Sequence, residues 1–153
     1  MIPPVAVPAL LDTNVPMYAA GAAHLYRDAC RWIMNEVAQG SLLVAIDVEC
    51  IQEILHRYGA LGRPVDAVTM ATDLLALVPI IYSVAPVDVQ TAVTLFQQYA
   101  PHGVRSRDVI HTAVMLNNGL TEIISADGHF DLIAGIWRTD PLALYQRATN
   151  QPP

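Results

Sequence analysis

The sequence predicts a single-domain α/β protein with a mostly parallel central sheet, and three observations support this fold class. Short apolar runs alternate with amphipathic segments along the whole chain, the pattern of strand–helix–strand units. Leu42–Ile46 is apolar throughout, as expected of a strand that is covered on both faces. The chain has 153 residues and neither an internal repeat nor a linker, which suits one domain.

In the first half of the chain, two strands alternate with helical segments. The elements expected there are, in order, a strand at 8–12, helices at 13–18 and 24–39, a strand at 42–46, and helices at 47–58 and 64–77. From His24 to Gln39, apolar residues recur at helical spacing. Asp47 is a suitable N-cap for the next helix, which Gly59 would end, and Pro64 suits the first turn of the helix after it.

In the second half, three strands alternate with three helices. The elements expected there are a strand at 79–82, helices at 87–99 and 106–117, a strand at 122–125, a short helix at 128–134 and a strand at 136–138. Ser106 is the expected cap of its helix, and Gly119 is a stop signal after it. We expect residues 1–7 to be an N-terminal extension, 8–146 to form the domain and 147–153 to be a disordered tail.

The composition limits the classes of protein that fit. Charged residues make up 14% of the chain, against about 25% on average, so part of its apolar surface is expected to be covered by a partner or a second copy. The alternative is a large core with alanine-rich helices. The net charge is −6 and all eight basic residues are arginine, so the chain lacks the broad basic face of most nucleic-acid binders.

Cysteine usage and hydropathy indicate where the protein works. Cys30 and Cys50 lie in predicted helices without metal-ligand spacing, and we interpret them as small buried residues in a reducing cytosol. Prolines interrupt the apolar N-terminus, and no apolar run reaches the roughly 18 residues of a membrane helix. A cytoplasmic protein without a membrane anchor is therefore expected.

Four carboxylates fall where predicted strands end or helices begin: Asp12, Glu53, Asp108 and Asp127. In an open parallel sheet these positions gather at one edge, where ligands bind. Clustered carboxylates repel one another, and a hard divalent cation with oxygen ligands relieves that repulsion. Each acid also has a plain alternative: Asp12 and Asp127 as helix caps, Asp108 at a helix dipole and Glu53 in solvent.

Four segments, in order, resemble the motifs of PIN-domain ribonucleases: Leu10–Val15, Ile51–Leu55, Ser106–Ala113 and Ile124–Asp131. The resemblance covers roughly residues 8 to 140. The size of the chain, without an appended domain, is most like that of the VapC-type toxins of toxin–antitoxin pairs. One departure is Asp47, where the family often has Ser or Thr, and the scarcity of basic residues is another.

The resemblance implies a PIN-like α/β/α sandwich and an endoribonuclease that depends on Mg²⁺ or Mn²⁺. The four acids would bind the metal and act in catalysis, with Asn14 and Ser125 orienting them. Asp131 would support the site, bind a second metal or only cap a helix. A cation held by carboxylates lowers the pKa of a bound water and stabilises the charge of the transition state.

The resemblance also implies an RNA substrate, an antitoxin that lays a peptide over the groove, and a homodimer. Arg105 and Arg107 flank Ser106 and could contact RNA phosphates. His111, one turn after Asp108, could also touch the substrate, although a hydrogen-bonded structural histidine is the favoured interpretation. Apolar faces of the helices at 64–77 and 87–99 are candidates for the dimer interface, or they belong to the core.

Three alternatives remain at this stage. The first is a non-catalytic PIN-like module that binds RNA or protein, but its mark would be a missing acid. The second is a phosphatase with an aspartate nucleophile, which would need a second Asp two residues after the first, where Asn14 stands, and which would find no lysine for the phosphate. The third is a purely structural α/β domain, which has no reason to bind Mn²⁺.

Overall fold

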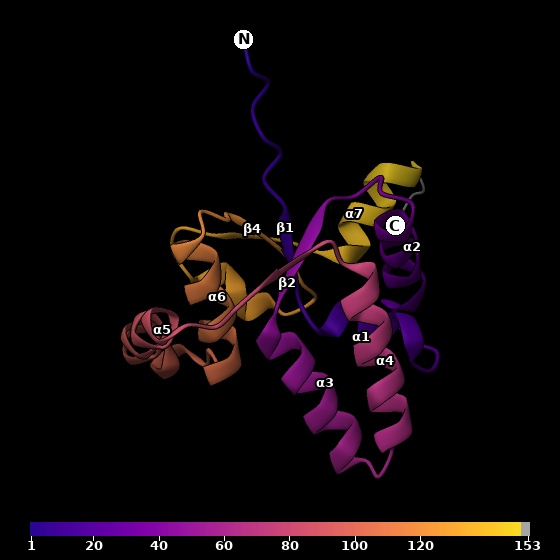
Figure 1. Ribbon diagram of the computed structural model, residues 1–153, viewed down its shortest axis with the longest axis horizontal. Coiled ribbons are helices and arrows are strands. Elements are labelled where there is room, and N and C mark those ends of the chain that lie inside the picture. The colour runs from indigo at the N-terminus through magenta and orange to yellow at the C-terminus, as the bar shows by residue number, and fades with distance from the viewer. Residues whose placement is uncertain (151–153) are drawn as a thin grey trace.

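A parallel sheet of five strands forms the centre of the computed structural model, which describes residues 1–150 (Figure 1). The strand order is β3-β2-β1-β4-β5, and each neighbouring pair is parallel. The strands are β1 (Ala9–Leu11), β2 (Val44–Asp47), β3 (Ile80–Tyr82), β4 (Glu122–Ile124) and β5 (Trp137–Thr139). The α/β fold class predicted from the sequence is confirmed.

Helices cover both faces of this sheet, which makes an α/β/α sandwich (Figure 1). One layer holds α1 (Asn14–Ala20), α2 (Arg27–Ala38), α3 (Val48–Ala60), α4 (Pro64–Leu77) and α7 (Pro141–Thr149). The other holds α5 (Pro86–Tyr99), α6 (Ser106–Asn117) and the 3-10 turns η1 (Ala100–His102) and η2 (Gly128–Leu132).

Alternation of side chains along the strands explains why the strand sequences are apolar throughout. In β1, Ala9 and Leu11 pack in the core under α1–α4, whereas Leu10 packs in the core under α5 and α6. The register pairs Leu10 with Ala45 of β2 and with Ile123 of β4, and all three side chains are fully buried. Because successive side chains point to opposite faces, both sets must be apolar when both faces are covered.

Helix capping differs in part from the prediction. Asp47 caps α3 as expected, since its Oδ1 accepts a hydrogen bond from the Cys50 amide at 3.2 Å. Ser106, in contrast, is the first residue of α6 and makes no capping hydrogen bond. Arg105 stands at the cap position, and its amide donates to Oδ2 of Asp108 at 3.1 Å. Asp108 thus satisfies one of the open amides at the start of α6.

The C-terminal helix α7 was not predicted, and the expected disordered tail at 147–153 is wrong for residues 147–149, which are helical. Residues 151–153 lie outside the described part of the chain. Asp140 caps α7 by accepting from the amides of Leu142 at 2.9 Å and Ala143 at 3.2 Å. Tyr26 donates to Asp140 Oδ2 at 2.7 Å, so the helix is fixed to the N-terminal half of the protein.

Candidate metal centre at the carboxyl edge of the sheet

The four acids singled out from the sequence line one small pocket of about 50 Å³. Asp12 directly follows β1, Glu53 lies in the second turn of α3, Asp108 in the first turn of α6, and Asp127 shortly after β4. The sheet brings them together because β1 lies between β2 and β4, so the carboxyl ends of the three strands meet there.

Asp12 is held by hydrogen bonds from its surroundings. Its Oδ2 accepts from Ser125 Oγ at 2.6 Å and from Asn14 Nδ2 at 3.2 Å, while Oδ1 accepts from the Thr13 amide at 2.7 Å. Ser125 also accepts from Asn14 at 3.2 Å and from the Asp127 amide at 2.9 Å. This network joins the ends of β1 and β4 and fixes the Asp12 carboxylate in one orientation.

His111, on the second turn of α6, lies beneath these acids and is only 1% exposed. Its Nδ1 is 2.7 Å from Oδ2 of Asp47, whose side chain is also buried. Its Nε2 lies 3.9 Å from Oδ1 of Asp12 and 3.9 Å from Oε2 of Glu53, and has no hydrogen-bond partner. This position favours the interpretation of His111 as a hydrogen-bonded buried histidine over a direct contact with RNA.

Burial and charge perturb the ionisation of this cluster. Burial raises the pKa of Asp12 to about 6, with repulsion from Glu53 and Asp108 adding to the effect. Burial likewise raises the pKa of Asp108, and the nearby Asp127 raises it further. Both directions are those expected of buried carboxylates that are crowded together.

For two groups in the cluster, Glu53 and His111, the pKa shift favours the charged form. Burial disfavours ionised Glu53, but His111 and Arg107 outweigh it and lower the pKa of Glu53. Burial also disfavours protonated His111, but the carboxylates of Asp47, Glu53 and Asp12 raise its pKa well above the ordinary value. The cluster therefore attracts positive charge.

The donor atoms fit a divalent cation. One atom each from Asp12, Glu53 and His111 lie within 4.8 Å of one another, and all three residues are buried. Two carboxylates with an imidazole are common ligands of divalent ions, and a cation would relieve the carboxylate repulsion. Asp108 and Asp127 line the same pocket and could bind the ion directly or through water.

Asp127 and Asp131 differ in their surroundings although they are close in sequence. Asp127 lines the acidic pocket and also caps η2, since its Oδ1 accepts from the His129 amide at 2.9 Å. Asp131 is not among the residues that line this pocket. It forms a two-point ion pair with Arg138 of β5, at 3.1 and 3.0 Å, and this pair ties η2 to the sheet.

Three arginines surround the mouth of the acidic pocket. Arg57, Arg105 and Arg107 line it, and together with His56 they also line an adjoining pocket of about 300 Å³. Arg107 lies 3.5 Å and Arg57 3.9 Å from Oε1 of Glu53. Arg57 was not singled out from the sequence. Its place one helical turn after Glu53 is the signal that could have found it.

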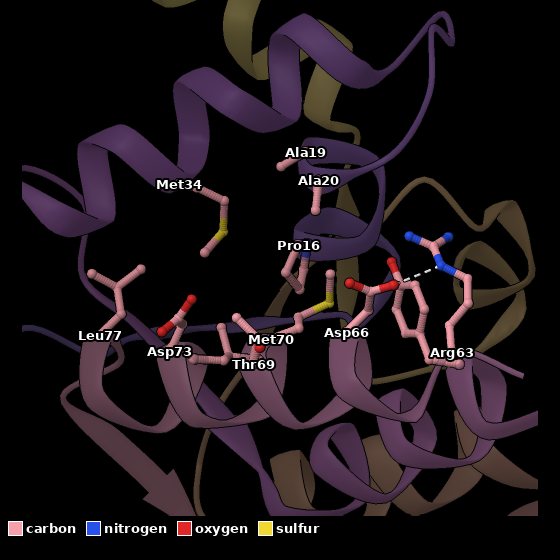
Figure 2. A pocket seen from close by; sticks show the side chains of 12 residues that line it. Pro16, Ala19, Ala20, Met34, Arg63, Asp66, Thr69, Met70, Asp73 and Leu77 are labelled. Atoms are coloured by element: carbon pink, nitrogen blue, oxygen red, sulfur yellow. Dashed lines mark hydrogen bonds and ion pairs between the residues drawn. The ribbon is translucent and has the colours of Figure 1, made fainter.

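A larger pocket of about 380 Å³ lies away from the acids, between α4 and the α1–α2 pair. Figure 2 shows Met34 and Met70 pointing into it from opposite sides, with Ala19, Ala20 and Pro16 above α4. Arg63 and Asp66 close one end with an ion pair at 2.8 Å. None of the four acids lines this pocket, so it is a separate, mainly apolar surface feature.

The PIN-domain family model matches residues 9–136, which include the first four strands of the central sheet, β1 to β4. The chain belongs to this family. It is 37% identical over 133 residues to Ribonuclease VapC13 of Mycobacterium tuberculosis, covering 84% of this chain and 97% of the relative. This similarity places the chain in the VapC group of the family.

Solved structures share the fold at low sequence identity. The M. tuberculosis toxin VapC20, a sarcin-ricin-loop-cleaving toxin, has a TM-score of 0.69 at 15% identity and covers 84% of this chain and 96% of its own. A chain of a toxin–antitoxin complex from Klebsiella pneumoniae has a TM-score of 0.60 at 18% identity, covering 87% and 97%. Among residues 1–150, no helix combines the length and the hydropathy that crossing a membrane requires.

Proposed function

We propose that this chain is a metal-dependent endoribonuclease that cleaves RNA phosphodiesters and serves as the toxin of a toxin–antitoxin pair. The observation that carries the proposal is the single pocket lined by Asp12, Glu53, Asp108 and Asp127. The relatives named VapC ribonucleases support the same reaction class. We take Mg²⁺ or Mn²⁺ as the ion.

The residues present can carry out hydrolysis of a phosphodiester. When bound, the ion would supply a bound water of lowered pKa and positive charge against the phosphate. Asp12 and Glu53 would hold the ion, and hydrogen bonds from Ser125 and Asn14 keep the Asp12 carboxylate from rotating. The pocket is small and lined by charged side chains, so we expect a phosphate of the RNA backbone, rather than a base, to lie over its carboxylates.

Arginine side chains beside the acids could explain how a chain with a net negative charge binds RNA. Three of the eight basic residues, Arg57, Arg105 and Arg107, line the pocket and its neighbour. Guanidinium groups bind phosphate oxygens in a two-point manner. We expect the scissile phosphate to lie over the acids while flanking phosphates contact these arginines. A local basic patch then substitutes for a basic surface overall.

The alternative is a non-catalytic PIN-like module that binds RNA or protein. Such a module has no need for all four acids in one pocket, or for the hydrogen bonds that hold Asp12. The full set of acids therefore favours catalysis.

We further propose that a cognate antitoxin covers the groove and blocks the acids, because related structures include a toxin–antitoxin complex. The methionine-lined pocket between α4 and the α1–α2 pair is our candidate for its apolar side chains, since Met adapts to varied partners. A homodimer is also proposed. A small protein with a DNA-binding N-terminus, encoded by a neighbouring open reading frame, would support the toxin assignment.

Cleavage of a structured RNA with Mg²⁺ or Mn²⁺ tests the enzyme assignment. Asp12→Asn and Asp108→Asn keep the shape of the side chain but remove charge, so each should lower cleavage by orders of magnitude. Asp73→Asn, an exposed acid of α4 outside the acidic pocket, is the matched control. Cleavage that persists in EDTA would overturn the mechanism. If the RNA target is not in the assay, growth arrest on expression, relieved by Asp12→Asn, is the second readout.

A further inference from the structure

The Nε2 atom of His111 is a buried polar atom without a partner. The residue is 1% exposed, and Nε2 forms no hydrogen bond among residues 1–150. Leaving such an atom unpaired is unfavourable, so native proteins rarely do so without a reason. The atom faces two carboxylates, Asp12 at 3.9 Å and Glu53 at 3.9 Å, and both distances are too long for a hydrogen bond. A group placed among these three residues would satisfy all of them.

Asp47 sets the orientation of the His111 ring. One carboxylate oxygen of Asp47 accepts from the Cys50 amide, and the other lies 2.7 Å from Nδ1 of His111. Both side chains are almost fully buried, so neither can rotate without breaking a hydrogen bond. The surrounding carboxylates raise the pKa of His111, so a cation bound here would have to displace the proton on Nε2. With Nδ1–H still donating to Asp47, the Nε2 lone pair of the neutral ring would then face Asp12 and Glu53. Metal-binding histidines are commonly held by a carboxylate in this way.

We infer that Nε2 of His111 is a direct nitrogen ligand of the cation held by Asp12 and Glu53, and that Asp47 is the positioning residue that presents it. This inference rests on the proposed metal-dependent function. An imidazole ligand favours first-row transition ions, whereas Mg²⁺ prefers oxygen ligands and keeps its waters. The site therefore binds Mn²⁺ in preference to Mg²⁺.

The rival role for His111 is that of a permanent internal cation. In that case the imidazolium would neutralise the three carboxylates around it, and the metal would bind to carboxylates alone. The two roles differ in one observable: only a ligand places its nitrogen in the coordination shell of the metal.

Pulsed electron paramagnetic resonance of the full-length protein loaded with Mn²⁺ separates the two roles. A directly bound imidazole gives a ¹⁴N modulation that carboxylates and water do not. We expect this signal in the wild type and its loss in His111→Gln. Titration calorimetry should show a fall of about 10- to 100-fold in Mn²⁺ affinity for the variant. The ratio of Mn²⁺ to Mg²⁺ affinity should fall with it.

Asp47→Asn is a second variant that leaves the buried volume unchanged. Its side-chain oxygen can still accept from the Cys50 amide, but its amide group would donate to Nδ1 of His111. The proton of a neutral ring would then be on Nε2, where it blocks coordination, so the ¹⁴N signal should be lost although His111 is present. A thermal melt checks that Asp47→Asn is folded. If His111→Gln does not fold, the ¹⁴N signal of Asp47→Asn decides between the two roles by itself.

His129→Ala and His56→Ala serve as controls because both histidines are near the pocket. His129 Nδ1 lies 2.7 Å from Asp127, and His56 lines the adjoining arginine pocket. Both variants should keep the ¹⁴N signal. Loss of the signal in His129→Ala would show that His129 supplies the nitrogen ligand, and would contradict our proposal. Mn²⁺ binding without any ¹⁴N signal would overturn the role of His111 and leave the proposed nuclease standing. Failure to bind either ion would instead contradict the metal-dependent function itself.

Discussion

The hydroxyl oxygen of Ser125 lies 2.6 Å from Oδ2 of Asp12 and joins the carboxyl ends of β4 and β1. The same hydroxyl accepts from the amide of Asp127, so one small side chain fixes two of the four acids. A residue that orients a metal ligand is often nearly as important to the site as the ligand itself.

Ser125→Ala should therefore weaken metal binding without unfolding the protein. The change removes the donor to Asp12 and the acceptor for the Asp127 amide, and we expect Mn²⁺ affinity to fall about 10- to 100-fold in titration calorimetry. Ser41→Ala, at an exposed turn on the opposite edge of the sheet, is the matched control. Unchanged affinity in Ser125→Ala would mean that Asp12 does not depend on this hydrogen bond.

Asp12→Asn should stabilise the metal-free protein although it impairs the enzyme. At neutral pH Asp12 is ionised although it is buried, and burial, with a smaller contribution from the neighbouring carboxylates Glu53 and Asp108, disfavours this charge and raises its pKa to about 6. Removing the charge should increase the free energy of unfolding in EDTA by about 1–3 kcal/mol, a few degrees in melting temperature. With saturating Mn²⁺ the order should reverse, because the wild type gains more from binding. A lower melting temperature for Asp12→Asn in EDTA would contradict the idea that the buried Asp12 charge destabilises the metal-free protein.

Arg105→Gln and Arg57→Gln should each weaken RNA binding in a salt-dependent manner. Each lost phosphate contact lowers the slope of log affinity against log salt by about 0.7–0.9. The measurement is a filter-binding series in the Asp108→Asn background, where cleavage is suppressed. Arg147→Gln, an exposed arginine of α7 outside both arginine-lined pockets, should leave the slope unchanged. An equal effect at Arg147 would place the RNA elsewhere.

Asp140→Ala should destabilise the protein by about 1–3 kcal/mol, because Asp140 caps α7 and accepts from Tyr26 and Arg138. Burial would raise the pKa of Asp140, but these hydrogen bonds outweigh it and lower the pKa below its ordinary value of 3.8. A lowered pKa means that the stabilisation is complete above pH 4 and is lost as the pH falls further. Denaturant unfolding at pH 7 and pH 3 should therefore show a smaller difference in the free energy of unfolding between variant and wild type at pH 3.

Asp66→Ala is the control for this comparison, since its ion pair with Arg63 is more than half exposed on both sides. Such surface pairs contribute little. An effect at Asp66 as large as that at Asp140 would show that any lost ion pair destabilises the fold, and would contradict the specific role of the α7 cap.

We expect a homodimer at micromolar concentration in sedimentation velocity. The α5 helix exposes Val89, Val93 and Phe96 along one side, which is an unusual amount of apolar surface for a free helix face. Val93→Glu should shift the protein towards monomer if this face is the interface, and Val68→Glu on the exposed side of α4 tests the other candidate. A wild-type protein that is monomeric at this concentration would contradict the dimer.

Local signals were sufficient to predict most of the fold from the sequence. The continuous apolar runs identified strands that are buried on both faces, and the Asp47 cap located the start of α3. The helix α7 was missed although Asp140-Pro141 is a cap followed by a first-turn proline. Its stability depends on Tyr26, which is 114 positions away and cannot be paired with Asp140 from periodicity alone.

The site could likewise be predicted only as far as local signals reach. Strand ends in a parallel sheet converge by topology, so the acids could be assigned to one edge without knowing any distance. The pairing of His111 with Asp47, 64 positions apart, is a tertiary contact that no local pattern encodes. Burial of His111 is likewise decided by how α6 packs on the sheet, so its position beneath the acids appears only in the folded structure.

The 113 positions between Asp12 and Ser125 also have a consequence during translation. The first acid leaves the ribosome well before the strand that precedes Ser125 and Asp127 has been synthesised. A nascent chain on the ribosome therefore has an incomplete pocket, whatever helices it has already formed. The capacity to damage RNA would arise only after the segment that contains Ser125 and Asp127 has been made, so products that terminate before it should be harmless to the cell that makes them.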